Sequence, residues 1–215
     1  MSTPPCQLYL ITPPQLPDFT GFVDTFRAVL DAAAGTPAQV ACVQLRLKGA
    51  GDDEILRAAE VLLPLAAAAD AALLINDHPR LAKKAGADGV HIGQQDTPYE
   101  EARKILGPDA AIGVTCHNST HLAMEAGEAG ADYVAFGAFY PTATKEVVHQ
   151  AEPDILTFWS QATTVPCVAI GGITPDNAAP LVAAGADFIA VSGSVWQAPD
   201  GAVAAIAEFA EVLGR

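Results

Sequence analysis

The phrase AGADGVHIG at residues 85–93 decides the fold, because it returns as AGADYVAFG at residues 129–137 and as AGADFIAVSG at residues 184–193. The glycine of each copy suits the left-handed position that closes a helix. The apolar run behind each aspartate is nearly continuous, which is typical of a parallel strand covered by helices. Each copy therefore predicts the end of a helix followed by a buried parallel strand.

Eight segments of the chain have this strand character, and a helical stretch follows each of them. The strands are predicted at residues 8–12, 42–47, 72–77, 89–93, 111–116, 133–138, 167–172 and 188–193, and the last helix at residues 201–213. Eight units of ~27 residues lie at the compact end of the (β/α)₈ range. The sequence thus predicts an α/β fold, a single (β/α)₈ TIM barrel in which residues 1–215 form one catalytic domain.

The alternative architecture is an open, doubly wound sheet. Such a sheet would carry a glycine-rich GxGxxG phosphate loop directly after its first strand. The chain has LITPPQLPD at this place, residues 10–18, without a single glycine. The barrel is therefore the favoured interpretation.

Composition limits the partners that the protein can have. The 215 residues are 51% hydrophobic, enough for a sizeable core, and the net charge is −14 from 25 acidic and 11 basic side chains. This charge argues against binding to nucleic acid or to anionic membranes. The longest apolar stretch, residues 61–75, is interrupted by Pro64 and Asp70, and the four cysteines have no metal-binding spacing. We expect a cytoplasmic protein with reduced cysteines and small-molecule partners, and the sequence leaves open whether it is a homodimer.

The stretch VQLRLKG at residues 43–49 alternates polar and apolar residues, as a strand does. It places Gln44, Arg46 and Lys48 on one face. In an antiparallel sheet this face would be the wet one, whereas in a barrel it points inward and toward the active-site mouth. Two cations there are costly unless an anion meets them, so this stretch predicts an anion-binding site.

Carboxylates follow the next two strands. Asn76 and Asp77 end the third predicted strand, and Asp96 lies just beyond the fourth. Because the carboxyl ends of barrel strands meet at one mouth, we expect both aspartates near the cations. They could be salt-bridge partners of these cations, or they could hold Mg²⁺ that bridges to phosphate oxygens.

A second, neutral anion site is predicted at the far side of the mouth. Gly171 and Gly172 follow the seventh strand and would let backbone amides approach a ligand, while Ser192 and Gly193 follow the eighth. Backbone amides of these two loops commonly bind phosphate in TIM barrels. The loop FYPTATKE at residues 139–146 adds polar groups, namely Thr142, Thr144 and Lys145.

Together these segments resemble the thiamine phosphate synthase family over essentially the whole chain. The shared motifs are YLIT, QLRLK, IND, GADGVHIGQQD, IGVTCH, GADYVAFGAFYPTATK, AIGGI and GADFIAVS, in the family's order and approximate spacing. The resemblance implies a transferase that joins 4-amino-2-methyl-5-hydroxymethylpyrimidine diphosphate to 4-methyl-5-(2-phosphoethyl)thiazole. The products would be thiamine phosphate and diphosphate, formed by a dissociative, Mg²⁺-assisted substitution.

The resemblance also implies roles for individual residues. The pyrimidine diphosphate would contact Gln44, Arg46, Lys48, Asn76, Thr115 and Lys145. The thiazole phosphate would contact Thr142, Thr144, Gly172, Ser192 and Gly193. The metal ligands for Mg²⁺ would be Asp77 and Asp96, and the catalytic group would consist of Arg46, Lys48, Thr115 and Lys145.

The chain departs from the family pattern in three places, and two other functions remain as alternatives. Thr115 stands where serine is usual, Ala138 where proline usually follows Gly137, and Ser192 with Gly193 where a Val/Ile–Ser pair is common. The alternatives are a thiazole tautomerase of the same superfamily and a barrel that binds thiamine precursors without turnover. The complete set of diphosphate and metal residues favours the synthase over both.

Overall fold

The computed structural model describes residues 5–142 and 149–214, and in this part of the chain eight parallel strands close into a barrel in sequence order. The strands are β1 Gln7–Ile11, β2 Val40–Leu45, β3 Ala72–Asn76, β4 Gly89–Ile92, β5 Ala111–His117, β6 Tyr133–Gly137, β7 Cys167–Ile170 and β8 Phe188–Val191. The barrel closes where β1 pairs with β8, with Leu8 opposite Ile189. The predicted TIM barrel is confirmed.

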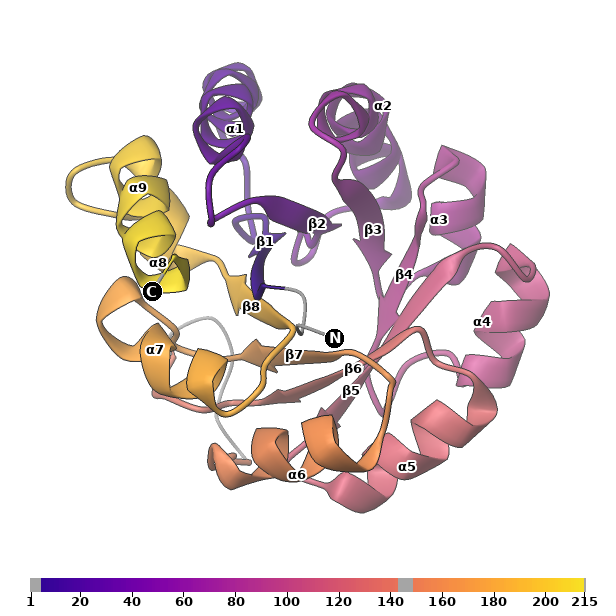
Figure 1. The fold of residues 1–215 in the computed structure, drawn as a ribbon. Helices are drawn as coiled ribbons and strands as arrows, with labels where there is room; N and C mark the ends of the chain where they lie inside the picture. Colours follow the sequence, from indigo (N-terminus) through magenta and orange to yellow (C-terminus); the bar gives the residue numbers. More distant parts are fainter. Residues whose placement is uncertain (1–4, 143–148, 215) are drawn as a thin grey trace.

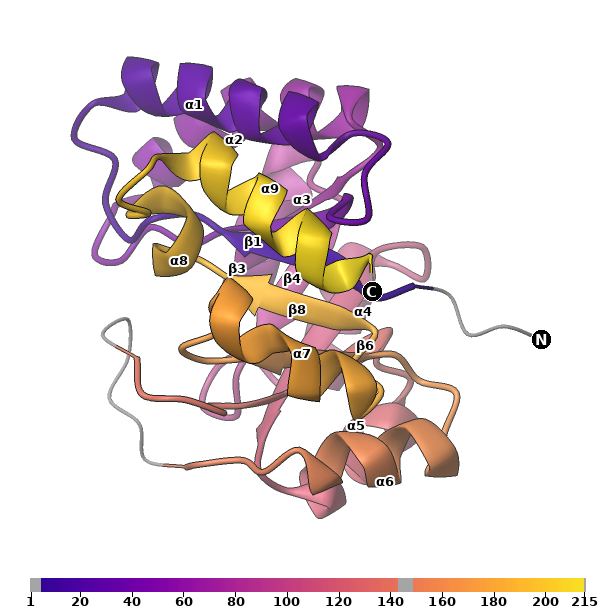
Figure 2. The same ribbon diagram turned by 60° about the vertical axis from the view of Figure 1, so that its left-hand side comes forward.

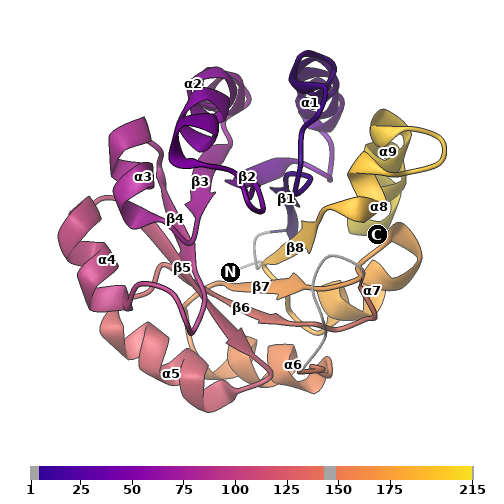
Figure 3. The same ribbon diagram turned by 180° about the vertical axis from the view of Figure 1, so that it is seen from behind.

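Helices surround the strands on every side (Figures 1 and 3). They are α1 Phe19–Ala33, α2 Asp52–Ala68, α3 Pro79–Ala85, α4 Tyr99–Leu106, α5 Thr120–Ala129, α6 Asp154–Ala162, α7 Pro175–Ala183, α8 Gly193–Trp196 and α9 Ala202–Leu213. The first and last long helices, α1 and α9, lie alongside each other and complete the ring (Figure 2). The short α8 is an extra helix directly after β8, a common feature next to phosphate sites in this fold.

The core has two parts because alternate residues of each strand face opposite ways. The larger cluster lies between strands and helices and contains Phe26, Leu62, Trp159 and Phe209. The smaller cluster fills the barrel interior and includes Tyr9, Leu74, Tyr133 and Val168. Polar residues are buried among the strands as well, namely Gln44 and His91. The barrel interior is thus partly polar.

The repeated phrase forms the structure that its pattern predicts. Gly86 ends α3 and Gly130 ends α5, both in the left-handed conformation with φ of 68° and 100°. Gly185 follows α7 with φ of 100°. These angles favour glycine, which has no Cβ to clash with the carbonyl. Each glycine turns the chain sharply from a helix into the next strand.

The aspartate of each phrase has a role that the sequence did not indicate. Its carboxylate accepts a hydrogen bond from a backbone N–H at the start of the preceding strand. Asp88 accepts from Leu73 at 2.7 Å, and Asp187 accepts from Cys167 at 2.8 Å. The third aspartate, Asp132, accepts from the N–H of Ile112 at 2.8 Å and also pairs with Arg103 at 2.7 Å. Each phrase therefore fastens two neighbouring strands at their amino ends.

Two further observations concern the expectations from composition. All four cysteines are free, and burial raises the pKa of each thiol above its ordinary value. Within the described residues, no helix has the length and apolar character needed to span a membrane.

Candidate active site

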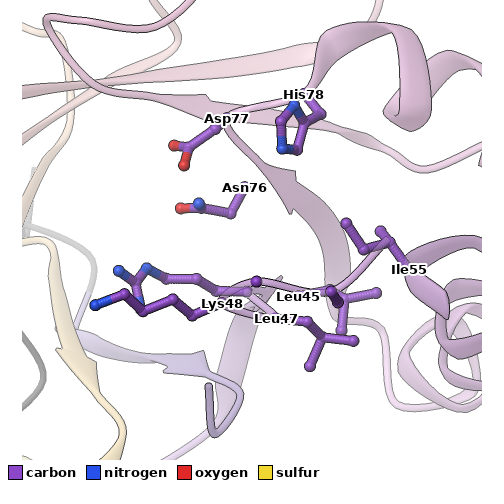
Figure 4. Close-up of a pocket in the computed structure, with 10 residues that line it drawn as sticks. Leu45, Leu47, Lys48, Ile55, Asn76, Asp77 and His78 are labelled. Carbon is purple, nitrogen blue, oxygen red and sulfur yellow. The ribbon is translucent and has the colours of Figure 1, made fainter. Parts of the chain in front are cut away.

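A polar cavity of about 300 Å³ lies at the carboxyl ends of β2 and β3. Its polar lining comes from the last residue of β3, Asn76, and from residues that follow the two strands, namely Arg46, Lys48, Asp77 and His78. The side chains of Lys48, Asn76 and Asp77 extend toward the same side of the cavity, as Figure 4 shows. The structure thus brings together the cations of one predicted strand end and the carboxylate of the next.

The exit of β2 is shorter than predicted. We expected the strand to include Arg46, but it ends at Leu45. The physical reason is that the Arg46 N–H leaves the ladder and donates to the Thr12 hydroxyl at 2.9 Å. Two residues later the Lys48 N–H donates to the carbonyl of Pro14 at 2.8 Å. The loop after β1 therefore holds the segment that carries both cations.

Asp77 and Asp96 meet beside this cavity. The Asp77 backbone has φ of 63°, and its N–H donates to the carbonyl of His91 at 2.8 Å, which ties it to β4. Asp96 accepts from the N–H of Gly93 at 2.7 Å. Burial, then the hydrogen bond and charge of the Asp96 carboxyl, raise the pKa of Asp77 to about 6, although Arg46 acts in the opposite direction. Two carboxylates this close attract a cation or a proton.

This pair fits Mg²⁺ better than a metal that needs a full set of protein ligands. No cluster of three or more His, Cys, Asp or Glu side chains is placed to hold a metal among the residues that the structure describes. Mg²⁺ is commonly bound by one or two carboxylates together with substrate phosphate oxygens and water. The donor set of Asp77 and Asp96 matches this pattern.

Gln44 and Thr115 lie on the inner side of the barrel wall. Gln44 is buried, and its amide nitrogen donates to the Tyr9 hydroxyl at 2.9 Å. Thr115 is half-buried, with its hydroxyl 2.8 Å from Nε2 of His91, and its carbonyl accepts from Gln94 at 2.6 Å. Neither residue belongs to the lining of the polar cavity; the hydrogen bonds to Tyr9 and His91 hold both of them at the barrel interior.

The glycines that follow β7, on the other side of the mouth, are required by the packing of the protein itself. A Cβ at Gly172 would lie 2.3 Å from the carbonyl oxygen of Pro141, and φ there is 64°. The neighbouring Gly171 accepts from the N–H of Tyr140 at 3.0 Å. From the sequence we expected Gly172 to allow a ligand to approach the backbone. In the structure its missing side chain also leaves space for the loop after β6.

The ends of β7 and β8 are ordered by side chains. Asn177 accepts from the N–H of Thr174 at 2.8 Å in a capping box and donates to the carbonyl of Gly172 at 3.0 Å. Ser192 occupies the N-cap position of α8, and its hydroxyl donates to the carbonyl of Thr12 at 3.5 Å instead of accepting a hydrogen bond from the helix. Gly193 lines a second cavity of about 190 Å³ together with Thr174. Thr12 thereby contacts the exits of both β2 and β8.

The loop after β6 is only partly described. Thr142 is half-buried within it. The predicted site residues Thr144 and Lys145 lie outside the described residues. Their roles remain predictions.

Sequence reasoning missed three residues of the barrel interior, namely Tyr9, His91 and Tyr133. They join Gln44 to Thr115 through hydrogen bonds. His91 lies in the strand that was predicted at residues 89–93, and its sequence position indicated no role. The available signal was position: Tyr9 and Gln44 are polar residues on adjacent inner strand positions, since Tyr9 pairs with Cys42 two residues before Gln44.

The fold and the site define a class: a TIM-barrel protein with a cation-lined cavity at the carboxyl ends of its strands and a pair of interacting carboxyl groups beside it. Comparison with known proteins specifies the family. The thiamine monophosphate synthase family matches residues 8–195. The protein belongs to this family.

Individual relatives agree with this placement. The chain is 60% identical over 208 residues to thiamine-phosphate synthase of Rhodospirillum centenum, covering 97% of this chain and 98% of the relative. It is 51% identical over 210 residues to that of Hyphomonas neptunium, covering 96% and 93%. The solved structure of thiamine phosphate pyrophosphorylase from Pyrococcus furiosus superposes with a TM-score of 0.82 at 31% identity, covering 97% of this chain and 95% of that one. The protein is accordingly an enzyme, a transferase of the thiamine-phosphate synthase type.

Proposed function

We propose that the protein joins 4-amino-2-methyl-5-hydroxymethylpyrimidine diphosphate to 4-methyl-5-(2-phosphoethyl)thiazole, giving thiamine phosphate and diphosphate in the cytoplasm. The observation that supports this most strongly is the cavity in which Arg46 and Lys48 share a lining with Asp77. The cations suit the negative charges of a diphosphate, and the neighbouring carboxylate pair suits a metal ion that the diphosphate also binds.

The bond changes set what the site has to do. The C–O bond between the methylene carbon of the pyrimidine and the diphosphate breaks first, and its electron pair leaves with the diphosphate oxygen. The pyrimidine stabilises the methylene cation that remains, and the lone pair of the thiazole nitrogen then forms the C–N bond. This substitution removes no proton from carbon, so it needs no general base. Its main demand is stabilisation of the negative charge on the departing diphosphate.

Arg46 and Lys48 would meet this demand from one side of the cavity, with Lys145 as the third cation that the family pattern implies. A well-placed group of this kind contributes roughly 2.7–4 kcal/mol to a transition state. The backbone that carries both cations is fixed before the reaction, because the N–H groups of Arg46 and Lys48 donate to Thr12 and Pro14. Asn76 would add a neutral contact from β3.

Asp77 and Asp96 would hold Mg²⁺ when the diphosphate is bound. The ion would supply positive charge that stabilises the leaving diphosphate. The protein's own contribution is to keep two carboxylates close together, and burial together with this contact raises the pKa of Asp77. A bound cation would favour the ionised form of both carboxyl groups.

The thiazole phosphate would bind at the exits of β7 and β8, on backbone groups of Gly172, Ser192 and Gly193 and on Thr142, with Thr144 as a further expected contact. Thr12 contacts the exits of β2 and β8. The two half-sites would therefore face each other across one mouth, as a reaction between two phosphorylated molecules requires.

The direct test combines the purified protein with both phosphorylated substrates and Mg²⁺ and measures thiamine phosphate and diphosphate. We expect both products in equal amounts, and none when either substrate is omitted. Isomerisation of a thiazole carboxylate phosphate without coupling would identify a tautomerase instead. Tight binding of both precursors without product would identify a binding protein.

A further inference from the structure

Thr12 is a buried polar residue, 1% exposed, that comes directly after β1. This strand lies between β2 and β8 and pairs with one on each side (Figure 3). Thr12 therefore stands between the end of β2, which Arg46 follows, and the end of β8, which Ser192 follows. Both strand ends belong to the proposed active site, so Thr12 is placed to influence it without lining the polar cavity.

The hydroxyl of Thr12 takes the place of a backbone carbonyl. The Thr12 N–H donates to the carbonyl of Gln44 at 3.0 Å, as in a regular parallel ladder. If this ladder continued, the N–H of Arg46, two residues after Gln44, would donate to the carbonyl of Thr12. It donates to the Thr12 hydroxyl at 2.9 Å instead. The side chain of Thr12 thus ends the ladder and determines where the backbone of Arg46 leaves β2.

The backbone around Thr12 is held on both sides. Pro13 and Pro14 follow it in the sequence. Proline fixes its own φ and keeps the residue before it in the extended region, so the path after Thr12 is restricted. On the other side, the indole of Trp196 donates to the carbonyl of Ile11 at 2.7 Å. The acceptor for the Arg46 N–H is therefore in place before a ligand binds.

The carbonyl of Thr12 connects to the other half-site, but only weakly. It accepts a hydrogen bond from the Ser192 hydroxyl at 3.5 Å, which is long for a contact between two oxygens. The contact of the Thr12 hydroxyl with the Arg46 N–H, at 2.9 Å, has ordinary length. The effect of Thr12 should therefore appear on the side of the mouth that binds the pyrimidine diphosphate.

Arg46 is the residue through which Thr12 can act on the reaction. It is half-buried and lines the polar cavity together with Asn76 and Asp77. A guanidinium group binds phosphate through two parallel hydrogen bonds, so its contribution depends on its exact placement. Misplacement of a catalytic group by ~1 Å can lower the rate by about 100-fold. The point at which the Arg46 backbone leaves the strand is thus important for catalysis.

We propose that Thr12 is a positioning residue for the departing diphosphate: its hydroxyl replaces a ladder carbonyl, releases the Arg46 backbone from β2, and so places the guanidinium group against the leaving group. The statement about the leaving group rests on the proposed function, whereas the hydrogen bond that ends the ladder does not. Arg46 would stabilise charge that appears only as the C–O bond breaks. Thr12 should therefore affect kcat more than KM.

The hydrogen bond is tested in the unmodified full chain without substrate. NMR detects a scalar coupling from an amide nitrogen to the carbonyl carbon that accepts its hydrogen, and a hydroxyl acceptor gives no such coupling. We expect a coupling from the Thr12 nitrogen to the Gln44 carbonyl, and none from the Arg46 nitrogen to the Thr12 carbonyl. A coupling between Arg46 and Thr12 would show a continued ladder and overturn the proposal, and this measurement needs no variant that has to fold.

Thr12→Val removes the acceptor and keeps the branched shape of the side chain. We expect kcat to fall about tenfold or more, with little change in KM for the thiazole phosphate. Thr12→Ser keeps the hydroxyl and should retain most of the rate. Unchanged kcat in Thr12→Val, or equal losses of kcat in the valine and serine variants, would overturn the proposal.

Thr36→Val is the matched control for Thr12→Val. The Thr36 hydroxyl accepts from the N–H of Ala38 at 3.2 Å, just before β2 and at the amino end of that strand. Its loss should lower stability in the same way, because a backbone N–H again loses a hydroxyl acceptor. It should leave kcat unchanged. A similar fall of kcat in both variants would mean that Thr12 acts only through stability.

A double-mutant cycle tests whether Thr12 acts through Arg46. In an Arg46→Met background, Thr12→Val should lower kcat little further, because the group that it positions is gone. A loss of about tenfold in both backgrounds would indicate a merely structural role and overturn the proposal.

Binding of inorganic diphosphate with Mg²⁺ separates this proposal from the proposed function. Free diphosphate carries the charge that develops on the leaving group. Calorimetry should therefore show its affinity reduced about tenfold in Thr12→Val, the effect of one disturbed charged hydrogen bond, and unchanged in Thr36→Val. A protein with this pattern that forms no thiamine phosphate would refute the proposed function alone. Formation of thiamine phosphate with unchanged diphosphate affinity in Thr12→Val would refute the positioning role alone.

Discussion

The carboxyl groups of Asp77 and Asp96 interact directly, and burial, followed by the hydrogen bond and charge of Asp96, raises the pKa of Asp77 to about 6 from an ordinary value of 3.8. The two residues come from the loops after β3 and β4, which are joined by the hydrogen bond from the Asp77 N–H to the carbonyl of His91. The barrel therefore maintains a repulsion that unfolding would relieve. Ground-state repulsion of this kind is common where a cation is bound.

The first prediction concerns the pH dependence of stability. Between pH 3.8 and about 6 the folded protein binds more protons at Asp77 than the unfolded chain does. Stability from this group is therefore present at low pH and is lost as pH rises through 6. Asp77→Asn mimics the protonated form and tolerates the positive φ. Without metal, this variant should gain stability relative to the unmodified protein between pH 4.5 and 7.5, as measured by urea unfolding, and a constant difference would contradict the assignment.

The second prediction concerns Mg²⁺. Two carboxylates alone should bind the ion weakly, and the affinity should rise when the pyrimidine diphosphate supplies further oxygens. By linkage, Mg²⁺ should increase the affinity for the diphosphate by the same factor. Titration calorimetry of Asp77→Asn and Asp96→Asn should show this coupling reduced in each. Normal coupling in both variants would make the aspartates salt-bridge partners of the cations and place the metal elsewhere.

The third prediction concerns Lys48, which is exposed and lines the polar cavity. Lys48→Met keeps the aliphatic stem and removes the charge, so turnover should fall by about 100-fold or more while the fold remains intact. Lys84→Met is the matched control, since Lys84 is exposed on α3 away from the cavity lining. Steady-state rates and circular dichroism measure the two effects. Unchanged turnover in Lys48→Met would remove this residue from the site.

The fold was predictable because its signals are local. Short windows of sequence contain the glycines that end α3 and α5 and the apolar strands that follow them, and counting these windows gives the number of strands. The partner of each repeated aspartate was not predictable. Asp88 finds the N–H of Leu73 only because β3 and β4 pair in one register, and a carboxylate in the sequence does not specify which distant donor it will meet.

The site was predictable to the extent that it follows strand ends. Asn76 and Asp77 lie where the third strand stops, as expected. The predicted end of β2 was wrong. The alternation of polar and apolar residues continues beyond Leu45, but the Arg46 N–H donates to the Thr12 hydroxyl and no longer to the neighbouring strand. Tyr9 and Tyr133 were missed because an aromatic residue in a buried strand has the same sequence pattern whether its hydroxyl is bonded or not.

The fourth prediction revises an expectation for Gly172. A side chain there meets the carbonyl of Pro141 at 2.3 Å and must adopt φ of 64°. Gly172→Ala should therefore lower the free energy of unfolding by about 1–2 kcal/mol. It should also weaken the binding of the thiazole phosphate. Binding of the pyrimidine diphosphate should persist, because Arg46 and Lys48 lie on other strands. Calorimetry with equal losses for both ligands would show that the two half-sites are not separate.

The last prediction concerns the aspartate of the repeated phrase. The Asp187 carboxylate accepts from the N–H of Cys167 and fastens β8 to β7 at their amino ends. Asp187→Ala leaves a half-buried N–H without this acceptor, so the free energy of unfolding should fall by about 1–3 kcal/mol. Asp187→Asn keeps an oxygen acceptor without the charge and should lose less.

Asp31→Ala is the control for Asp187, because Asp31 is an exposed aspartate on α1 and its loss should change stability by less than about 0.5 kcal/mol. Urea unfolding at pH 7 compares the three variants. Turnover should be nearly the same in all of them, since the contact lies at the opposite end of the strands from the polar cavity. A stability loss in Asp187→Ala no larger than in Asp31→Ala would mean that the hydrogen bond contributes nothing, and that the phrase recurs for its glycine and its apolar strand alone.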